Sequence, residues 1–402
     1  MRYDVIVVGA GPAGATAAKF LAENNIRTLL IDKQKYPRDK PCGGILSMRT
    51  LKRFPYITDD LIDAYSYGGS ITSSSLRHHL QIQKEEPIAA YVLRKHFDQG
   101  LVNQAVQSGA TFRDQTTAET IQRTNDTIQL RSHEGETLES HIIIGADGIW
   151  STVAKHAGLR EKNPRIGRCL FQEYPLENTL LDQYFTKERC FQFYLKFKGI
   201  EGTGWVFPKK NSVNIGIGEI QRVASQQTTT PQLKEVYSDF LEVLKEKKLI
   251  PPIITIGTMQ GGVLPLHPLE KTYADRIILC GDAAGLMNPL TGDGIHYAMS
   301  SGMFAAKVCA KAVEANDTSV EFLSKYQRFW KDDFGEEITL CTSILKRLLK
   351  HDDEKYIKIV SKDTQLIDML LNITNNQVRI HTYKWKIIRR FMSLYVKNLL
   401  GL

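Results

Sequence analysis

The chain has 402 residues, of which 42% are hydrophobic and 24% charged, and this is enough apolar sequence for two or three units with cores of their own. Lys and Arg total 52 against 44 Asp and Glu, and six of the eight excess positive charges lie in residues 371–402, which contain no acidic residue. Because the rest of the chain is close to neutral, the sequence predicts no nucleic-acid partner.

The six cysteines are scattered and none forms a C-x-x-C pair, so the sequence predicts no metal site. The sequence begins directly with an expected strand, which leaves no room for a signal peptide. No apolar stretch approaches the roughly 20 residues that a membrane-spanning helix needs. These features favour a reducing, cytoplasmic location.

The first residues predict a dinucleotide-binding turn. Val5–Val8 is a short apolar run, as expected of a strand buried on both faces, and the pattern Gly-x-Gly-x-x-Gly follows it directly. The glycines allow a tight turn and let the backbone approach a pyrophosphate at the N-terminus of an alanine-rich helix, residues 13–22. The cofactor-binding residues expected here are Gly9, Gly11, Pro12, Ala13 and Gly14.

The next buried strand, Thr28–Ile31, ends in an acid that suits an adenosine ribose. Asp32 lies where a carboxylate accepts hydrogen bonds from the ribose hydroxyls, and Lys33 beside it is assigned to the same site. Asp32 also argues against NADP here, because a 2′-phosphate would meet a like charge. A glycine-rich structural turn is the alternative interpretation, but strand, glycines, helix and acid agree with one another.

A second motif, about two-thirds of the way along the chain, predicts that the dinucleotide is FAD and the protein a redox enzyme. Ile277–Leu279 reads as a buried strand, and the acid after it can accept hydrogen bonds from ribityl hydroxyls. Two glycines then precede a helix over 295–310, whose first amides would stabilise an anionic reduced flavin. An acid that merely caps a helix is the alternative. The residues assigned to this half of the site are Gly281, Asp282, Gly292, Asp293, Gly294 and Ile295.

Alternating patterns elsewhere predict a second domain inserted into the first. Residues 190–197 and 212–220 alternate between apolar and polar side chains, and Gly68-Gly69 is expected to form a turn or bulge. The predicted fold class is α/β: a Rossmann-like FAD-binding domain, an inserted α+β two-layer substrate domain on an antiparallel sheet, and a helical C-terminal region. The expected boundaries are 1–60, 90–160 and 255–312 for the FAD domain, 61–89 and 161–254 for the substrate domain, and 313–402 for the C-terminal region.

The order of these motifs resembles the para-hydroxybenzoate hydroxylase superfamily of flavoproteins. Between the two flavin motifs stand Arg94, which opens an expected helix, and the Asp147-Gly148 pair within Gly145–Ser151. The resemblance implies that Arg94 contacts the FAD phosphates or ribose and that Asp147 supports the flavin. Taken alone, Arg94 would more often be a solvated helix residue.

Within that superfamily the chain is most similar to the geranylgeranyl reductases. Lys40–Gly44 matches their P-C-G-G loop, and Gly204–Lys210 followed by Val213–Gly218 matches their W-x-F-P…G-x-G signature. Residues 261–265 and 281–294 match their flavin-side motifs. The resemblance implies that Cys42, Gly43 and Gly44 belong to the cofactor loop and that Trp205, Phe207 and Pro289 contact the substrate.

Such a reductase moves hydride from reduced flavin to one carbon of an isoprenoid double bond and a proton to the other. This alkene has no oxygen to polarise, so alignment over the flavin and an apolar site must lower the barrier. Cys42 is the candidate catalytic proton donor, since a thiol has a pKa of about 8.5; the alternative is a small residue in a tight loop. Trp205 and Phe207 share one side of a strand and suit a polyprenyl chain, or else pack in a core.

The sequence contains no second dinucleotide fingerprint, so electrons are expected from transiently docked NAD(P)H or from a protein donor such as reduced ferredoxin. The basic C-terminal tail alternates apolar and cationic residues at helical spacing. This pattern suits a peripheral position on the inner face of an anionic membrane, beside an isoprenoid lipid substrate. A helix packed on its own protein is the ordinary alternative.

Two other functions remain open from the sequence: an aromatic monooxygenase or halogenase of the same fold, and a non-enzymatic flavin redox relay at a membrane. The W-x-W-x-I-P segment of the halogenases is absent. The sequence leaves open the head group and chain length of the substrate, the number of bonds reduced and the oligomeric state.

Overall fold

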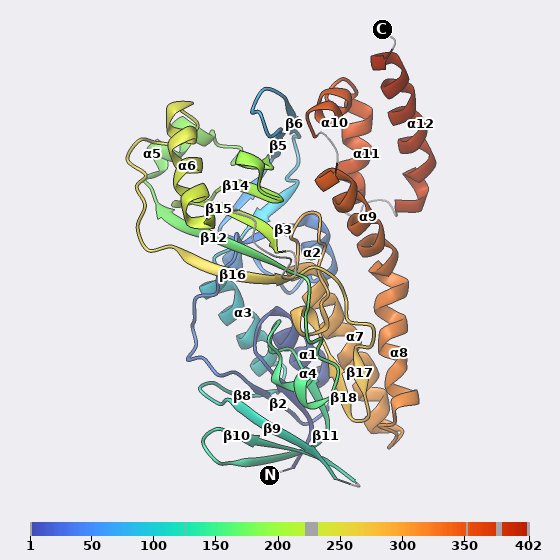
Figure 1. Ribbon diagram of the computed structural model, residues 1–402. Helices are drawn as coiled ribbons and strands as arrows, with labels where there is room; N and C mark the ends of the chain where they lie inside the picture. Colours follow the sequence, from blue (N-terminus) through green and yellow to red (C-terminus); the bar gives the residue numbers. More distant parts are fainter. Residues whose placement is uncertain (1, 125, 222–231, 351–352, 375–379, 400–402) are drawn as a thin grey trace. The chain divides into compact units, whose positions relative to one another are not determined.

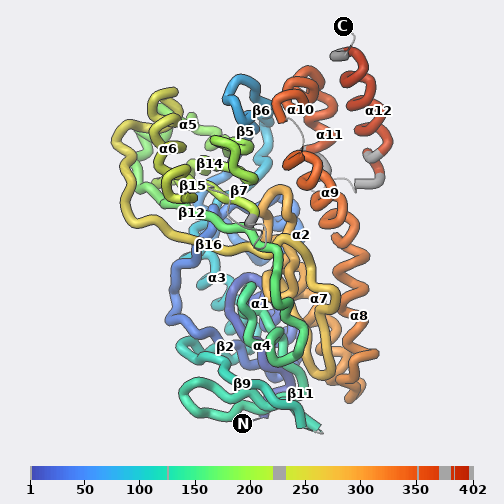
Figure 2. The backbone as a smooth tube through the Cα atoms, viewed as in Figure 1, coloured from blue at the N-terminus to red at the C-terminus, as the bar shows by residue number. Residues whose placement is uncertain are grey.

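The computed structural model describes residues 2–124, 126–221, 232–350, 353–374 and 380–399 (Figure 1). The chain forms two compact units, each assembled from three separate stretches that the sequence colours of Figure 2 distinguish. The first unit comprises Met1–Lys40, Arg94–Ile166 and Leu264–Leu345, and the second comprises Pro41–Leu93, Gly167–Val263 and Lys346–Leu402. Residues 41–60 and 346–402 therefore group with the stretches that the sequence assigned to the substrate domain.

A mostly parallel sheet forms the centre of the first unit. Its strands are β1 (Arg2–Val8), β2 (Thr28–Ile31), β8 (Thr111–Arg113), β11 (Thr137–Gly145), β17 (Tyr273–Ala274) and β18 (Ile277–Leu279). β10 (Ile128–Ser132) also pairs with β11, and β9 (Ala118–Arg123) pairs with β10. The order is β17-β18-β11-β1-β2-β8, and the four pairs from β18 to β8 are all parallel. Every side chain of β2 is buried, as expected of a strand covered on both faces.

Helices pack on this sheet, and two of them approach each other closely. They are α1 (Pro12–Glu23), α3 (Arg94–Gln107), α4 (Thr152–His156), α7 (Ile295–Glu314) and α8 (Val320–Trp330). The short helix η3 (Gly281–Ala284) follows β18, and the π-helical segment η4 (Lys331–Gly335) joins α8 to α9 (Glu336–Lys350). The helices predicted at 13–22 and 295–310 are confirmed as α1 and α7. A Cβ at Gly302 of α7 would lie 2.2 Å from the carbonyl oxygen of Ala13 in α1, so no side chain fits between the helices at this position.

The second unit is built on a seven-stranded sheet of order β16-β12-β15-β14-β13-β5-β6. Its strands are β5 (Gly68–Thr72), β6 (His79–Gln83), β12 (Ile166–Pro175), β13 (Phe191–Leu195), β14 (Gly202–Pro208), β15 (Ser212–Gln221) and β16 (Gln260–Pro265), and a smaller sheet contains β3 (Ile45–Ser47), β7 (Ala89–Tyr91) and β4 (Ala64–Ser66). The strands predicted at 190–197 and 212–220 are confirmed as β13 and β15. Both pair antiparallel with β14.

The prediction of a turn or bulge at Gly68-Gly69 is wrong. Both glycines lie in β5, where they pair with Gln83 and Ile82 of β6. A Cβ at Gly69 would lie 2.2 Å from the ring of Phe191. This glycine therefore makes room for an aromatic ring that lies on the strand. Space for a ring, and not a turn or bulge, explains glycine at this position in the sheet.

The two faces of the seven-stranded sheet differ. One face packs on α6 (Leu233–Glu246) and α5 (Asn178–Phe185), and Val206, Val213 and Ile215 belong to this hydrophobic core. Because successive strand residues point to opposite faces, Trp205, Phe207 and Asn214 project from the other side. This second side is called the aromatic face below.

The remaining helices of the second unit are α2 (Met48–Arg53), η1 (Asp59–Leu61), η2 (Phe197–Gly199), α10 (Asp353–Val360), α11 (Thr364–Thr374) and α12 (Ile380–Leu399). The last three contact one another (Figure 1). Asp353 of α10 accepts hydrogen bonds from the amide and hydroxyl of Ser74, at 2.8 and 3.0 Å. Within the described part of the chain, no helix is long and apolar enough to cross a membrane.

We expect Gly302→Ala to destabilise the protein, because its Cβ would collide with the α1 backbone; overpacking of this kind costs about 1–3 kcal/mol. Chemical denaturation followed by circular dichroism measures the free energy of unfolding. Gly335→Ala is the matched control, since the Cβ of this helical glycine would make only ordinary contacts, 3.4 Å or longer. Equal stability of the two variants would contradict the close packing of α1 and α7.

Candidate functional site

The glycine turn of the first unit has no room for side chains at two of its positions. Gly9 has a φ of +98°, and a Cβ there would lie 2.3 Å from the carbonyl oxygen of Ala146. A Cβ at Gly14 would lie 1.8 Å from the Gly9 carbonyl oxygen. Gly11 is the N-cap of α1 and no side chain caps the helix, so the first amides of α1 remain available to an anion. Pro12 and Ala13 form the first turn, and the arrangement fits a pyrophosphate.

The carboxylate of Asp32 is oriented by two backbone amides at the end of β2. The Ala10 amide donates to Oδ2 at 2.8 Å, and the Gln34 amide donates to Oδ1 at 2.9 Å. Each carboxylate oxygen can accept a further hydrogen bond, so the hydroxyls of a ribose remain able to donate to Asp32. The side chain of Lys33 is exposed beside it.

A buried arginine that the sequence analysis missed lies beside the glycine turn. Arg38 is 9% exposed, and its Nη2 lies 3.0 Å from Asp98 and 3.6 Å from the Cβ position of Gly11. Its Nη1 is buried and has no hydrogen-bond partner among the described residues. A buried N–H without an acceptor is costly, so a dinucleotide phosphate or hydroxyl fits this position. No motif around Arg38 separates it from the other cations of the 33–44 loop.

Arg94 is the second cation of this cluster. Its Nε and Nη2 both donate to the carboxylate of Asp98, at 2.7 Å each. Asp98 is fully buried and holds Arg94 and Arg38 together, while Arg38 also lies over the ring of Tyr36, 5.0 Å from its centroid. Arg94 is thus a buried, ordered residue and not a solvated one. Two guanidinium groups against one carboxylate leave a net positive charge near the turn, which favours a phosphate.

The carboxylate of Asp147 accepts hydrogen bonds from the residues at the start of α4. Its Oδ1 accepts from the hydroxyl of Ser151 at 2.5 Å, and its Oδ2 accepts from the amides of Thr152 and Val153 at 2.7 and 3.2 Å. Burial raises the pKa of Asp147, and these hydrogen bonds act in the opposite direction. Asp147 therefore shapes the loop that brings Ala146 against Gly9, and its contact with a flavin stays a prediction.

Asp282 follows β18 and lies near the start of α7. Gly281 has a φ of +57°, and a Cβ there would lie 3.2 Å from the Cβ of Ala13 in α1. Asp282 Oδ2 lies 3.7 Å from Lys40 Nζ, and its Oδ1 lies 3.9 Å from the Cβ position of Gly294. The structure thus brings the strand end and the helix start of the second motif together within the first unit.

The loop before α7 contains the other residues of this motif. α7 begins after Gly294, and the amide of His296 in its first turn donates to Asp293 Oδ1 at 3.4 Å, so a ligand could use only the other amides of that turn. Gly292 is exposed with a φ of +74°, Asp293 is half-buried and Ile295 is buried. Pro289 is also buried. Its contact with a substrate stays a prediction.

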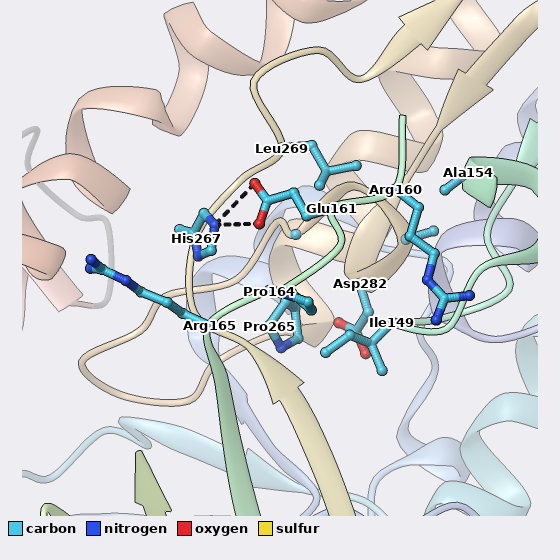
Figure 3. Close-up of a pocket in the computed structure, with 12 residues that line it drawn as sticks. Ile149, Ala154, Arg160, Glu161, Pro164, Arg165, Pro265, His267, Leu269 and Asp282 are labelled. Atoms are coloured by element: carbon cyan, nitrogen blue, oxygen red, sulfur yellow. Dashed lines mark hydrogen bonds and ion pairs between the residues drawn. The ribbon is translucent and has the colours of Figure 1, made fainter. Parts of the chain in front are cut away.

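A pocket beside Asp282 is lined by residues of the first unit alone (Figure 3). In its wall, His267 Nε2 lies 2.9 and 3.1 Å from the two carboxylate oxygens of Glu161. The guanidinium of Arg160 stacks over the ring of Trp150, 5.3 Å from its centroid. Carboxylate, imidazole and guanidinium groups around one cavity suit a polar ligand better than an alkyl chain.

In the second unit, the loop that contains Cys42 packs on the aromatic face. A Cβ at Gly43 would lie 2.7 Å from the Phe207 ring. Gly44 has a φ of +73°, and a Cβ there would lie 2.2 Å from the carbonyl oxygen of Val92. The thiol of Cys42 accepts a hydrogen bond from the Gly44 amide at 3.3 Å. The two glycines of the P-C-G-G loop are therefore needed to place Cys42 over the sheet.

Trp205 and Phe207 form the centre of the aromatic face. Their rings are stacked, with centroids 6.1 Å apart and an interplanar angle of 28°, and Phe193 meets Phe207 edge-on at 5.4 Å. A Cβ at Gly216 would lie 2.1 Å from the indole of Trp205. The first glycine of the G-x-G pattern thus lets the indole lie flat across β15. The structure brings Cys42, Gly43, Trp205 and Phe207 together, as one apolar surface beside a thiol.

The C-terminal helix α12 has one packed side and one exposed apolar side. Phe391 packs between Tyr356 of α10 and Tyr395, with centroids 5.8 and 6.2 Å apart. Four apolar residues at helical spacing are exposed: Trp385 (73%), Ile388 (43%), Met392 (52%) and Val396 (46%). Residues 375–379 and 400–402 of the tail lie outside the described residues.

Comparison with known proteins places this geometry in context. A family described as "FAD binding domain" matches residues 2–329. A digeranylgeranylglycerophospholipid reductase from Methanocaldococcus jannaschii is 31% identical over 401 residues, 98% of this chain and 98% of its own length. Digeranylgeranylglycerophospholipid reductase 2 from Methanococcoides burtonii is 34% identical over 365 residues, which are 88% and 86% of the two chains.

Solved structures share the fold at lower identity. A geranylgeranyl bacteriochlorophyll reductase-like protein from Thermoplasma acidophilum superposes with a TM-score of 0.79 at 24% identity, covering 95% of this chain and 98% of the other. The flavin-dependent brominase Bmp2 superposes with a TM-score of 0.74 at 16% identity, covering 93% and 94%. Because a reductase-like protein and a brominase share this fold, the fold alone does not select the reaction.

We expect Arg38→Met to weaken FAD binding about 10- to 100-fold, since one or more hydrogen bonds from a charged donor are lost while the side-chain volume stays similar. Titration of the apoprotein with FAD, followed by flavin fluorescence quenching, measures the dissociation constant. Arg27→Met is the control, because Arg27 pairs with Asp4 with its side chain 67% exposed. An unchanged dissociation constant for Arg38→Met would remove Arg38 from the site.

Proposed function

Because this chain belongs to the geranylgeranyl reductase family of FAD-dependent oxidoreductases, we propose that it reduces carbon–carbon double bonds in the isoprenoid chains of a lipid. Curated relatives are named for digeranylgeranylglycerophospholipids, and a lipid of that class is the substrate we propose. The observation that carries the proposal is the seating of the Cys42 loop on Trp205 and Phe207, which puts a thiol beside a flat apolar surface.

FAD, once bound and reduced, supplies the hydride. The residues of the first unit fit its parts: the glycine turn and Arg38 fit the pyrophosphate, Asp32 fits the adenosine ribose, and Asp282 fits the ribityl chain. The start of α7, which Asp282 approaches, supplies a helix dipole and the first-turn amides other than that of His296, and these favour negative charge on a ligand.

The aromatic face supplies what an unactivated alkene needs from the protein. Such an alkene offers no group to hydrogen-bond, so the protein can hold it only by shape and by burial of apolar area. The rings of Trp205 and Phe193 stay partly exposed beside the buried ring of Phe207, and they give an apolar surface on which an extended prenyl chain can lie. Covering this surface with the chain excludes water from the reacting carbons.

We propose that Cys42 donates the proton. Its thiol is half-buried in the loop that packs on Phe207, so a chain lying on the aromatic face passes next to it. Lys40, which pairs with Asp282, is only two residues before Cys42 in the chain. Peptide geometry therefore limits the distance between the Cα atoms of Lys40 and Cys42 to about 7 Å.

We propose that the electrons come from an external donor, either NAD(P)H or reduced ferredoxin. The single glycine fingerprint of the sequence is assigned to FAD, and a donor would therefore dock transiently. Anaerobic mixing of the oxidised holoenzyme with each donor, with flavin bleaching as the readout, distinguishes the two.

We also propose that α12 docks on an anionic membrane that carries the lipid substrate. Its exposed apolar stripe, Trp385, Ile388, Met392 and Val396, is flanked by the exposed cations Lys386, Arg389 and Lys397. An apolar stripe with neighbouring cations suits a helix that lies in the interface of an anionic bilayer. Another side of α12, which contains Phe391, is packed on α10.

We expect the full-length protein to sediment with phosphatidylglycerol vesicles, less with neutral phosphatidylcholine vesicles, and less at high salt. Trp385→Gln should reduce binding to the anionic vesicles several-fold, because Trp385 contributes the largest exposed apolar side chain of the stripe. Trp150→Gln is the control, since Trp150 is 52% exposed on the first unit. Equal binding by both variants would contradict docking through α12.

The proposed reaction is tested anaerobically with dithionite-reduced enzyme and a digeranylgeranylglycerol phosphate lipid. Mass spectrometry should detect products that have gained two hydrogens for each double bond reduced. Cys42→Ser should retain FAD and lose turnover about 100-fold or more, the usual effect of losing a positioned proton donor. Cys190→Ser, which alters another half-buried cysteine of the second unit, should leave turnover unchanged.

Unchanged turnover in Cys42→Ser would contradict the role of proton donor and leave Cys42 with a structural role in its loop. Product that forms only when oxygen is admitted, with oxygen consumed in proportion, would replace the reductase by an oxygenase or halogenase of the same fold.

A further inference from the structure

A polar cluster, part of which is buried, lies on the aromatic face next to the residues assigned to the substrate. Glu173 of β12 accepts three hydrogen bonds: from Lys209 Nζ at 2.8 Å, from Asn214 Nδ2 at 2.8 Å and from the Ser212 hydroxyl at 2.5 Å. Lys209 is 1% exposed and Asn214 is 0% exposed. All four residues belong to the second unit, on neighbouring strands β12 and β15 and the turn that joins β14 to β15.

This cluster is expensive to bury for stability alone. Burying the Lys209 ammonium, whose side chain is 2% exposed, costs several kcal/mol, although the Glu173 side chain beside it stays 30% exposed. Ion pairs of this kind can often be replaced by apolar residues without loss of stability. The other face of the same sheet is packed with apolar side chains such as Val206, Val213 and Ile215. A charged pair on the aromatic face therefore calls for a role other than packing.

Asn214 connects the cluster to both parts of the proposed substrate site. Its Oδ1 accepts a hydrogen bond from Trp205 Nε1 at 2.8 Å, and its Nδ2 lies 3.5 Å from the carbonyl oxygen of Cys42. Asn214 pairs with Phe207 across the β14–β15 ladder, two positions from the pairing of Gly216 with Trp205. A single side-chain amide thus contacts the indole and the Cys42 loop.

Glu173 determines which way this amide points. An asparagine side chain can present its oxygen or its nitrogen to a given neighbour, and only the nitrogen can donate to a carboxylate. Because Glu173 accepts from Nδ2, the Oδ1 atom is turned toward the indole N–H, which needs an acceptor. The Lys209 ammonium holds the other side of Glu173 and lies 3.2 Å from the Cβ position of Gly44, against the same loop.

We propose that Asn214, oriented by the Glu173–Lys209 pair, is a positioning residue that sets the Trp205 indole and the Cys42 loop for isoprenoid reduction. The proposal rests on the proposed function for its catalytic meaning, although the positioning itself can be measured without turnover. In this account Glu173 and Lys209 touch no substrate. They act through Asn214, and Asn214 acts through Trp205 and the Cys42 carbonyl.

The positioning is tested first by the indole N–H signal of Trp205 in ¹H–¹⁵N NMR of the FAD-loaded protein. The sequence contains four tryptophans, and Trp205→Phe identifies the signal. Asn214→Leu should shift this signal and accelerate its exchange with solvent hydrogen about tenfold, as expected for the loss of one buried hydrogen bond. An unshifted, equally protected signal in Asn214→Leu would overturn the proposal.

Two substitutions that together leave the net charge unchanged test the role of Glu173. Asn214→Asp alone should disturb the indole signal, because two carboxylates would face each other. Combining it with Glu173→Gln restores a donor opposite an acceptor and leaves the net charge of the wild type. The double variant should recover the protected indole signal; a double variant as disturbed as Asn214→Asp would overturn the orienting role of Glu173.

Turnover with the digeranylgeranylglycerol phosphate lipid gives the functional readout. Asn214→Leu should lower kcat about 10- to 100-fold with FAD still bound, since a misplacement of about 1 Å costs up to that factor. Tyr237→Phe is the matched control: its hydroxyl is bonded to Tyr174 at 2.9 Å on the opposite face of the sheet, so its loss should leave kcat and the indole signal unchanged. An equal loss of kcat in the control would assign the effect to general stability and overturn the proposal.

The two readouts separate this inference from the proposed function. If the wild type reduces no isoprenoid lipid but Asn214→Leu still shifts the Trp205 indole signal and speeds its exchange, the proposed function is wrong and the positioning role of Asn214 holds. If the wild type is an active reductase and Asn214→Leu changes neither readout, the function stands and the positioning fails.

Discussion

Close approach to a glycine that leaves no space for a Cβ is the constraint on which both candidate sites depend. In the first unit, the carbonyl group of Ala146 closes on Gly9, and the chain turns tightly from β1 into α1. In the second unit, Gly44 lies against the carbonyl group of Val92, and Gly216 lies under the indole of Trp205. A Cβ at any of these positions would occupy space already taken, so the ligand-facing surfaces exist only with glycine there.

The two units use this constraint to build surfaces of opposite character. The first unit surrounds its glycine turn with buried charge, since Asp98 holds two arginines beside the start of a helix. That environment suits the phosphates and hydroxyls of a dinucleotide. The second unit places glycines under the aromatic rings of its sheet, and Lys209 and Glu173 orient Asn214 instead of meeting the substrate.

The sequence predicted the parts of the fold and site that local pattern determines. The glycine turn, the strand over 277–279 and the P-C-G-G loop can be recognised because their residues are neighbours in the chain. Gly68-Gly69 shows the limit of this reasoning: glycine signals a turn locally, but the ring of Phe191, distant in sequence, requires glycine inside a strand. Arg38 was missed because its burial and its partner Asp98 become visible only in the folded chain. The same holds for the Glu173–Asn214 cluster, whose members become neighbours only when β12 pairs with β15.

The central claim is that reduced flavin in this protein passes its electrons to an isoprenoid double bond. The most direct measurement mixes photoreduced holoenzyme with a digeranylgeranylglycerol phosphate lipid under anaerobic conditions and follows the absorbance of oxidised flavin in a stopped-flow instrument. The account predicts that oxidised flavin appears in a single turnover, with one double bond reduced for each flavin oxidised. A flavin that stays reduced in the presence of the lipid, and is oxidised only when oxygen enters, would contradict it.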